Sequence, residues 1–263
     1  MRSRRLLILA ALVASVPFTS DAAETPPRVF LLGGSTLAES RPPSLIRGWG
    51  QAFGAHFTAP GLVRNHAAGG RSSKSFIDQG RWAAVVAELR AGDWVIAQFG
   101  GGNDAKREDP ARYTDPATTY RDNLRRIVAE TRARGAHPIL ATMGAIRAWD
   151  AQGRFVSLPT PWVEATRAVA GELAVPLLDL RARTEELEAS LGPAGSVALH
   201  LHLPPGKHPG HPQGAQDDTH YSELGAARVA TLAADEIRRL HLPLARWLAP
   251  HASSSARPPG SQR

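Results

Sequence analysis

The sequence predicts an α/β fold, a three-layer α/β/α sandwich with a five-stranded parallel sheet. Short runs that are apolar throughout alternate with longer stretches whose apolar residues recur at helical spacing. This alternation is typical of buried parallel strands joined by right-handed helical crossovers. The length of 263 residues and the hydrophobic content of 43% allow one core of ordinary size, which excludes a disordered or collagen-like chain.

Each expected strand is a brief apolar run that glycine or polar residues terminate. Each expected helix carries apolar residues three and four positions apart, and Gly135 closes the second of these helices. Residues 199–218 are rich in Pro, Gly and His and are expected to form a long loop, which in a compact domain is often functional. The strands are expected at 28–32, 62–65, 94–99, 138–142 and 175–179, and the helices at 76–90, 118–134, 161–173, 181–191 and 222–240.

The two ends of the chain are expected to lie outside this domain. Three arginines precede a short apolar run and small residues follow it, as in a secretory signal peptide spanning 1–22. The signal predicts a secreted or periplasmic protein with no stable membrane association after its removal; an uncleaved anchor is the alternative. One domain is expected over 23–250, and the Ser/Pro/Gly-rich segment 251–263 is expected to be disordered.

Composition narrows the chemistry that the chain can perform. The absence of cysteine excludes a thiol nucleophile, disulfides and cysteine-based metal sites. The net charge of +7 permits an acidic partner, but the arginines are interspersed with Glu and Asp and no nucleic-acid-reading motif is present. A nucleic-acid partner is therefore not expected, whereas a basic surface would suit an acidic polysaccharide.

Three expected strands end in polar, glycine-rich segments, and a fourth polar segment precedes the last helix. Ligands of open parallel sheets bind beyond the carboxyl ends of the strands, so these segments are expected to meet at one edge. Taken alone, each would be an ordinary turn or helix cap. The segments are Gly33-Gly-Ser-Thr36, Asn65-His-Ala-Ala-Gly-Gly-Arg-Ser-Ser73, Phe99-Gly-Gly-Gly-Asn-Asp104 and Asp217-Asp-Thr-His-Tyr-Ser222.

Together these segments supply the parts of an acyl-transfer site. A serine hydroxyl needs a neutral imidazole to take its proton, so Ser35 and His220 are the candidate nucleophile and base. Asp217, three residues before the histidine, is the candidate partner of the second ring nitrogen. The backbone N–H groups of Ser35 and Gly70 and the side-chain amide of Asn103 are the candidate oxyanion hole. This chemistry requires no metal and no organic cofactor.

Two alternatives remain at the level of single residues. Asp218 is a rival of Asp217 as the partner of the histidine, although the three-residue step favours Asp217. The His-x-His at 200–202, with His208 or His211, would allow a zinc site. Proline and glycine around these histidines indicate an irregular wall rather than a rigid set of ligands, so no metal site is expected.

The order of the motifs resembles that of the SGNH (GDSL-type) hydrolases, and most closely that of their rhamnogalacturonan acetylesterase-like branch. The family usually has Asp where this chain has Gly34, and the branch commonly has Gly-His-Asn-Asp where this chain has an additional glycine before Asn103. The matching motifs are Gly-Gly-Ser-Thr at 33–36, Asn-x-Ala-x-Gly-Gly-Arg-Ser-Ser at 65–73, Gly-x-Asn-Asp at 101–104 and Asp-x-x-His at 217–220.

This resemblance implies the flavodoxin-like sandwich of that family and a carboxylic ester hydrolase. The implied reaction removes O-acetyl groups from a carbohydrate, in particular a rhamnogalacturonan- or pectin-like one, through a Ser-His-Asp triad and an acyl-enzyme. The expected partner is an acetylated oligo- or polysaccharide. Activity on lipid or other small esters, or carbohydrate binding without catalysis, are the alternatives. The candidates for substrate contact are Arg71, Asp104, Trp149 and His208.

Overall fold

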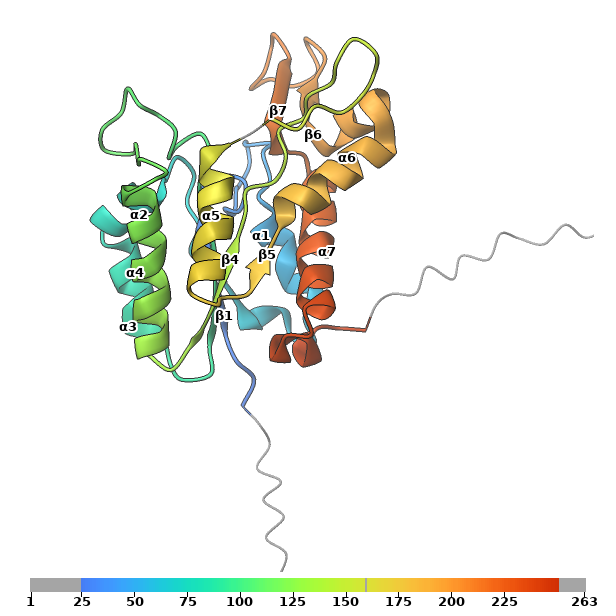
Figure 1. The fold of residues 1–263 in the computed structure, drawn as a ribbon. Helices are drawn as coiled ribbons and strands as arrows, with labels where there is room; N and C mark the ends of the chain where they lie inside the picture. Colours follow the sequence, from blue (N-terminus) through green and yellow to red (C-terminus); the bar gives the residue numbers. More distant parts are fainter. Residues whose placement is uncertain (1–24, 159, 251–263) are drawn as a thin grey trace, which may run out of the picture.

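The structure, a computed structural model, describes residues 25–158 and 160–250. The predicted signal peptide over 1–22 and the predicted tail over 251–263 lie outside these residues. A five-stranded parallel sheet in the order β2-β1-β3-β4-β5 forms the centre of the molecule (Figure 1). This is the flavodoxin-like order, which confirms the predicted fold. The strands are β1 (Val29–Gly33), β2 (Val63–Asn65), β3 (Trp94–Gln98), β4 (His137–Ala141) and β5 (Leu177–Leu178).

Helices cover both faces of this sheet (Figure 1). One face is covered by α2 (Ser73–Asp78), α3 (Arg81–Glu88), α4 (Thr119–Ala133) and α5 (Pro161–Glu172). The other face is covered by α1 (Trp49–Phe53) and α7 (Glu223–Arg239), with α6 (Leu180–Ser196) packed against α7. In the part of the chain described, no helix combines the length and the apolarity that a membrane span needs.

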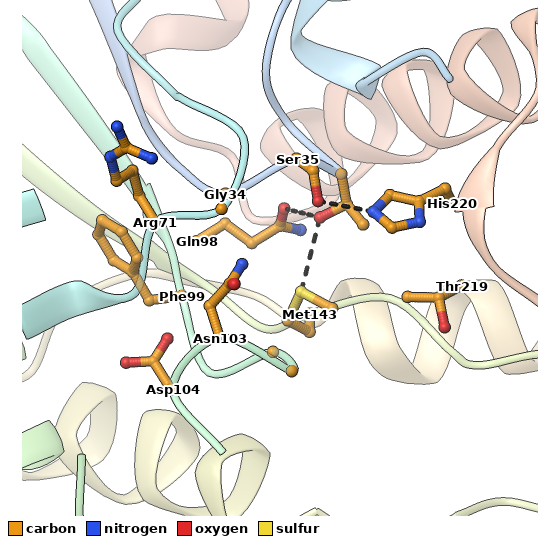
Figure 2. Close-up of a pocket in the computed structure, with 14 residues that line it drawn as sticks. Gly34, Ser35, Arg71, Gln98, Phe99, Asn103, Asp104, Met143, Thr219 and His220 are labelled. Carbon is orange, nitrogen blue, oxygen red and sulfur yellow. Dashed lines mark hydrogen bonds between the residues drawn. The ribbon is translucent and has the colours of Figure 1, made fainter. Parts of the chain in front are cut away.

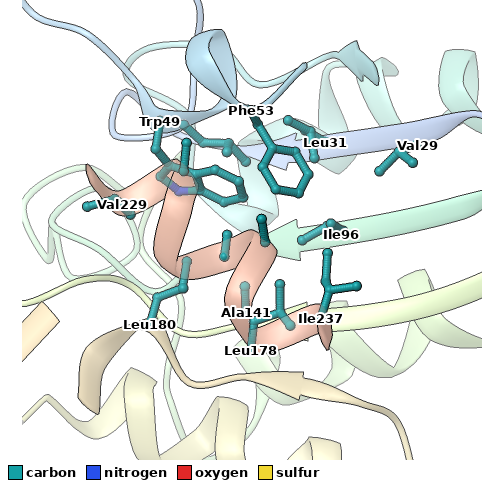
Figure 3. Close-up of a cluster of buried hydrophobic side chains, with 14 of the residues drawn as sticks. Val29, Leu31, Trp49, Phe53, Ile96, Ala141, Leu178, Leu180, Val229 and Ile237 are labelled. Atoms are coloured by element: carbon teal, nitrogen blue, oxygen red, sulfur yellow. The ribbon is translucent and has the colours of Figure 1, made fainter. Parts of the chain in front are cut away.

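The residues of the central strands alternate between two buried clusters. Val29 and Leu31 of β1 belong to the cluster beneath α1 and α7, which Figure 3 shows, and Phe30 and Leu32 belong to the cluster beneath α2 to α5. All four side chains are 0% exposed. Because helices cover both faces, both sets of side chains are apolar, and the strand is an uninterrupted apolar run in the sequence.

Two helices differ from their predicted bounds because of glycine. The single helix predicted over 76–90 is two helices, α2 and α3, because Gly80 between them adopts a φ of +73°. The helix predicted over 181–191 continues as α6 to Ser196 through a kink at Gly192, where φ is 70°. The helix α1 was not predicted, since five residues are too few for a helical pattern.

The prediction of a long loop over 199–218 is confirmed only for residues 204–214 and is wrong at both ends of the region. The region contains an antiparallel pair, β6 (His200–Leu203) and β7 (Ala215–Tyr221), in which Leu201 pairs with Asp217. The alternation His-Leu-His-Leu in β6 was a strand signal that the surrounding proline and glycine obscured. The pair lies at the edge of the main sheet where the parallel strands end (Figure 1). It therefore brings its polar residues to the edge at which a ligand site was predicted.

Candidate active site

Ser35 lies in a tight turn directly after β1. The carbonyl oxygen of Gly34 accepts hydrogen bonds from the backbone N–H groups of Leu37 and Ala38, at 3.1 and 3.0 Å. At Gly33 a Cβ would lie 2.6 Å from the carbonyl oxygen of the last residue of β3. Glycine therefore permits the close approach of two strands immediately before the turn, and the turn sets Ser35 at the carboxyl edge of the sheet.

Ser35, His220 and Asp217 form a continuous chain of side-chain hydrogen bonds. The Oγ atom of Ser35 lies 2.8 Å from Nε2 of His220, as Figure 2 shows, although the two residues are 185 positions apart in the sequence. The Nδ1 atom of His220 lies 2.7 Å from Oδ2 of Asp217. The serine follows β1 and the other two residues belong to β7. The structure thus brings together the three residues that were predicted to be catalytic.

The carboxylate of Asp217 is oriented by the backbone of β7. Its Oδ1 atom accepts the N–H groups of Thr219 and His220, each at 2.9 Å, which leaves Oδ2 for the imidazole. Partial burial raises the pKa of Asp217, but the hydrogen bonds from His220 and Thr219 outweigh burial and hold the pKa below its ordinary value. The ionised carboxylate favours the tautomer with its proton on Nδ1, so that Nε2 is free to accept the proton of Ser35.

Asp218, the rival of Asp217, lies outside this hydrogen-bond chain. Its Oδ1 atom accepts a hydrogen bond from Nη1 of Arg147 at 3.0 Å and lies 2.9 Å from Nε2 of His202. Successive residues of a strand point to opposite sides, and this alternation separates the two neighbouring aspartates. Asp217 is therefore the carboxylate that contacts His220.

Gly70 and Asn103, the other candidate oxyanion donors, line the same pocket as Ser35. Gly70 adopts a φ of +74°, a conformation that favours glycine. The Nδ2 atom of Asn103 lies 3.7 Å from the position that a Cβ of Gly34 would occupy. The same Cβ would lie 3.1 Å from the carbonyl oxygen of Arg71, so glycine at position 34, where the family usually has Asp, permits a close approach of the Ser35 turn to the backbone of Arg71.

The loop after β3, which contains the additional glycine, packs closely against neighbouring side chains. Gly100 has a φ of +87°, and a Cβ there would lie 2.7 Å from the hydroxyl oxygen of Tyr120. A Cβ on Gly101 would lie 2.8 Å from Cε of Met143. A larger residue at either position would require a neighbouring side chain to move. The loop folds back at these glycines and still places Asn103 in the pocket.

Asp104, a candidate for substrate contact, is a buried anchor of this loop and is 1% exposed. Its Oδ1 atom accepts hydrogen bonds from the backbone N–H and hydroxyl of Ser73 at 3.0 and 2.7 Å, and from the hydroxyl of Thr114 at 3.1 Å. Its Oδ2 atom accepts the N–H of Gly100 at 3.0 Å. Burial raises the pKa of Asp104 despite these donors. Contact with a substrate would require displacing these hydrogen bonds, so the carboxylate holds the loop in place instead.

Arg71, also predicted to contact substrate, lines the pocket. Its Nε atom donates to Oε1 of Gln79 at 2.7 Å, and its Nη1 atom donates to the carbonyl oxygen of Gly69 at 3.0 Å. Both acceptors are neutral. Arg71 therefore adds to the wall of this pocket a guanidinium whose positive charge these two partners do not neutralise.

Trp149 and His208, the remaining candidates for substrate contact, lie away from the residues that line this pocket. The ring of Trp149 packs edge-on against Phe155 with centroids 5.4 Å apart, and its Nε1 donates to Oγ of Ser196. His208 lies between β6 and β7 with its ring 5.7 Å from that of His211. Each of these side chains packs against residues of its own part of the chain, and neither lies beside Ser35.

The pocket around Ser35 has a volume of about 350 Å³, within the range of small-molecule sites. Segments after β1, β2, β3 and β4 form its walls together with β7 (Figure 2). Several of its lining residues had not been predicted as site residues, because single side chains in loops carry no motif and no periodicity. These residues are Thr36, Gln98, Phe99, Gly101, Gly102, Met143 and Thr219.

The histidines of the zinc alternative have other partners. Nε2 of His200 lies 2.5 Å from Oε1 of the buried Glu188, and Nε2 of His202 lies 2.9 Å from Oδ1 of Asp218. Within residues 25–158 and 160–250, no three or more His, Cys, Asp or Glu side chains are grouped so that they could hold a metal ion.

A flavodoxin-like sandwich with a Ser-His-Asp hydrogen-bond chain at the carboxyl edge of its sheet defines the class of this protein as a carboxylic ester hydrolase. Comparison with known protein families identifies the family within this class. The chain belongs to the GDSL-like lipase/acylhydrolase family, which matches residues 31–228. The resemblance that the motifs indicated is thereby confirmed.

Similarity to individual proteins supports this family assignment. The chain is 40% identical over 220 residues to the rhamnogalacturonan acetylesterase RhgT of Bacillus subtilis, covering 83% of this chain and 93% of that protein. It is 29% identical over 185 residues to a rhamnogalacturonan acetylesterase of Emericella nidulans, covering 62% of this chain and 71% of that protein. The crystal structure of the Bacillus subtilis protein YxiM matches with a TM-score of 0.67 at 25% identity, over 83% of this chain and 58% of that chain. An acetylxylan esterase of Geobacillus stearothermophilus shares the fold, with a TM-score of 0.55 at 20% identity over 80% of this chain and 94% of that chain.

Proposed function

We propose that this protein is a serine esterase that removes O-acetyl groups from an acetylated carbohydrate, in particular from rhamnogalacturonan. One observation carries the reaction: Oγ of Ser35 lies 2.8 Å from Nε2 of His220, whose Nδ1 lies 2.7 Å from Asp217. This arrangement activates a hydroxyl for attack on a carbonyl carbon. The substrate class is supported by the 40% identity to a rhamnogalacturonan acetylesterase over 83% of the chain.

The first half of the reaction transfers the acetyl group to the enzyme. The Oγ atom of Ser35 attacks the carbonyl carbon of the acetyl ester while its proton moves to Nε2 of His220. Asp217 stabilises the imidazolium that forms. When the tetrahedral intermediate collapses, the bond between the carbonyl carbon and the sugar oxygen breaks, and His220 returns the proton to that oxygen. The sugar leaves with a free hydroxyl, and the acetyl group remains on Ser35.

The second half uses the same groups with water as the nucleophile. His220 takes a proton from water as the water oxygen attacks the carbonyl carbon of acetyl-Ser35. Collapse of the second tetrahedral intermediate breaks the bond to Oγ, and the proton on His220 passes to the serine. Acetate leaves and the free enzyme is restored.

Negative charge develops on the carbonyl oxygen in both halves. The N–H groups of Ser35 and Gly70 and the Nδ2 of Asn103 are the donors that we assign to this charge, because all three residues line the pocket. Donors of this kind are effective because they are held in place before the charge appears. The two steps are complete with these groups, the three side chains and water.

A panel of acetylated substrates tests the proposed function directly. We expect acetate release from acetylated rhamnogalacturonan to exceed that from acetylated xylan, and a simple aryl acetate to be hydrolysed as well. Acetate can be quantified by a coupled assay and the product by mass spectrometry. Hydrolysis of the aryl acetate without any release from acetylated polysaccharides would contradict the carbohydrate assignment, and failure on every ester would contradict the esterase.

Arg71 provides a test of the charge of the substrate. Arg71→Gln is expected to lower kcat/KM on an acetylated acidic oligosaccharide by about tenfold, because a charge-assisted hydrogen bond to a carboxylate is lost. Hydrolysis of a neutral aryl acetate is expected to stay within about twofold of the parent protein. Arg81→Gln, at an exposed arginine that begins α3, serves as a control for the change in net charge. Equal losses on the charged and neutral substrates would contradict a carboxylate contact.

The pH dependence of the reaction follows from the two states of the imidazole. Once Nε2 of His220 is protonated it cannot accept the proton of Ser35, so kcat/KM should fall as the pH is lowered from neutral to weakly acidic. The pKa of Asp217 is lowered, so its carboxylate stays ionised through this range. The profile should be measured on a neutral aryl acetate. Undiminished activity at about pH 4 would contradict the role of His220.

The site of action is proposed from the sequence alone. The predicted signal peptide over 1–22 would direct the protein to the periplasm or out of the cell, where a polysaccharide substrate is accessible. Fractionation of expressing cells tests this proposal, since retention of the protein in the cytosol would contradict it.

A further inference from the structure

We propose that Arg112 is a positioning residue for this reaction, which fixes the side-chain amide of Asn103 so that its N–H donors face the oxyanion. This inference rests on the proposed esterase function. Arg112 belongs to none of the motifs that predicted the site. It reaches the pocket wall from the segment between β3 and α4, where Nη1 of Arg112 donates to Oδ1 of Asn103 at 3.2 Å.

The chemistry of the two groups determines the orientation of the amide. A guanidinium carries only donors, whereas an amide presents an acceptor at one corner and a donor at the other. The amide atom that faces Arg112 must therefore be Oδ1, and Nδ2 must point away from Arg112. Rotation of the amide by a half-turn would set donor against donor.

The opposite corner of the amide faces the reacting centre. The Nδ2 atom of Asn103 lies 3.7 Å from the position of a Cβ on Gly34, the residue before Ser35, and Figure 2 shows this nitrogen on the side of Gly34. Nη1 of Arg112 also lies 3.8 Å from the position of a Cβ on Gly70. The guanidinium is thus beside two of the groups assigned to the oxyanion.

Arg112 is itself held in place before any substrate binds. Its Nε donates to Oδ2 of Asp109 at 2.5 Å, and the side chains of these two residues are only 31% and 25% exposed. The carbonyl oxygen of Asp109 accepts the N–H groups of Arg112 and Tyr113 at 2.9 and 2.8 Å, and its Oδ1 accepts the N–H of Ala111 at 3.1 Å. This short turn orients the guanidinium, so the amide needs no rearrangement when negative charge develops.

Loss of Arg112 would remove the preference between the two orientations of Asn103. The amide has nearly the same shape after a half-turn, and only its hydrogen bonds distinguish the two states. In the turned state Oδ1 faces the oxyanion, which repels the negative charge that the amide should stabilise. The effect is expected in kcat rather than KM, because the charge exists only in the transition state and the intermediates.

Steady-state kinetics on a neutral aryl acetate test this proposal. Arg112→Ala is expected to lower kcat by roughly tenfold to a hundredfold with KM within about twofold of the parent, as for the loss of a charge-assisted hydrogen bond. Arg112→Lys, which keeps a cationic donor, is expected to recover part of this loss. Arg107→Ala is the control, since its guanidinium lies 5.2 Å over the ring of Tyr113 in the same segment.

A double-mutant cycle with Asn103 separates positioning from a general structural effect. Asn103→Ala alone is expected to lower kcat by about 10²- to 10³-fold, as for other single oxyanion donors. In the Asn103→Ala background, Arg112→Ala should cost no more than about twofold, because no amide remains to be positioned. A full additional loss in that background, a loss confined to KM, or parent-like kcat in Arg112→Ala would each overturn the proposal.

Two further measurements distinguish failure of the positioning role from misfolding of the variant and from failure of the proposed function. If Arg112→Ala fails to fold, as judged by thermal unfolding, the same cycle is run with Arg112→Lys and Asp109→Asn. The proposed function itself fails if the parent protein does not hydrolyse the aryl acetate, or if Ser35→Ala hydrolyses it equally well. When the parent is active and depends on Ser35, absence of coupling between Arg112 and Asn103 overturns only the positioning role.

Discussion

Replacement of Ser35 by alanine is expected to lower kcat for acetate release by a factor on the order of 10⁶, the loss typical when a serine nucleophile is removed. No other hydroxyl is hydrogen-bonded to Nε2 of His220 in the described part of the chain. Without Oγ no acyl-enzyme forms. A phosphonate probe that labels activated serines should therefore add its mass to the parent protein and not to the variant.

The control for this change is Ser190→Ala, at an exposed serine of α6. It removes a hydroxyl from the same protein and is expected to leave kcat and labelling unchanged. Both variants should unfold at nearly the temperature of the parent, since neither change creates a cavity in the core. Wild-type turnover in Ser35→Ala would remove Ser35 from its proposed role as nucleophile.

Replacement of Asp217 by asparagine is expected to lower kcat by about 10⁴-fold, with a small change in KM. The amide can keep its oxygen toward the N–H groups of Thr219 and His220, which Oδ1 now accepts at 2.9 Å each. Its NH₂ group then faces Nδ1 of the imidazole. Two donors cannot face each other, so the ring adopts the tautomer with its proton on Nε2 and cannot accept the proton of Ser35.

Asp218→Asn is the matched control for this prediction. It makes the same chemical change one residue along β7, at a side chain that contacts Arg147 and His202 rather than His220. Its kcat is expected to stay within about tenfold of the parent, because its contacts stabilise the strand and do not reach the imidazole. A severe loss in Asp218→Asn together with a mild loss in Asp217→Asn would reverse the assignment of the two aspartates.

Much of the sheet could be predicted from local sequence, and the reason is burial on both faces. Phe30 and Leu31 point to opposite clusters, and both are fully buried, so β1 is apolar at every position. The polar strand β7 gave no such signal. It is stabilised by pairing with β6 and by the hydrogen bonds of its own side chains, which hydropathy does not report.

The roles of individual site residues were less predictable than their positions. Asp104 was a candidate for substrate contact, yet its oxygens are occupied by Ser73, Thr114 and Gly100. Arg112 was not a candidate at all. Its contact with Asn103 arises from the path of a loop, and no spacing rule connects residues on such a path.

The sequence by itself determined the five strands of the parallel sheet, the long helices between them, the family and the set of polar residues at one edge of the sheet, because these follow from periodicity, glycine positions and motifs. Only the tertiary structure decided which aspartate meets His220, where the Asn103 amide points and which candidates lie apart from Ser35. These outcomes depend on distances of a few ångströms between segments far apart in the chain. Hydrogen bonds are sensitive to such distances, whereas the hydrophobic pattern that specifies the fold is not.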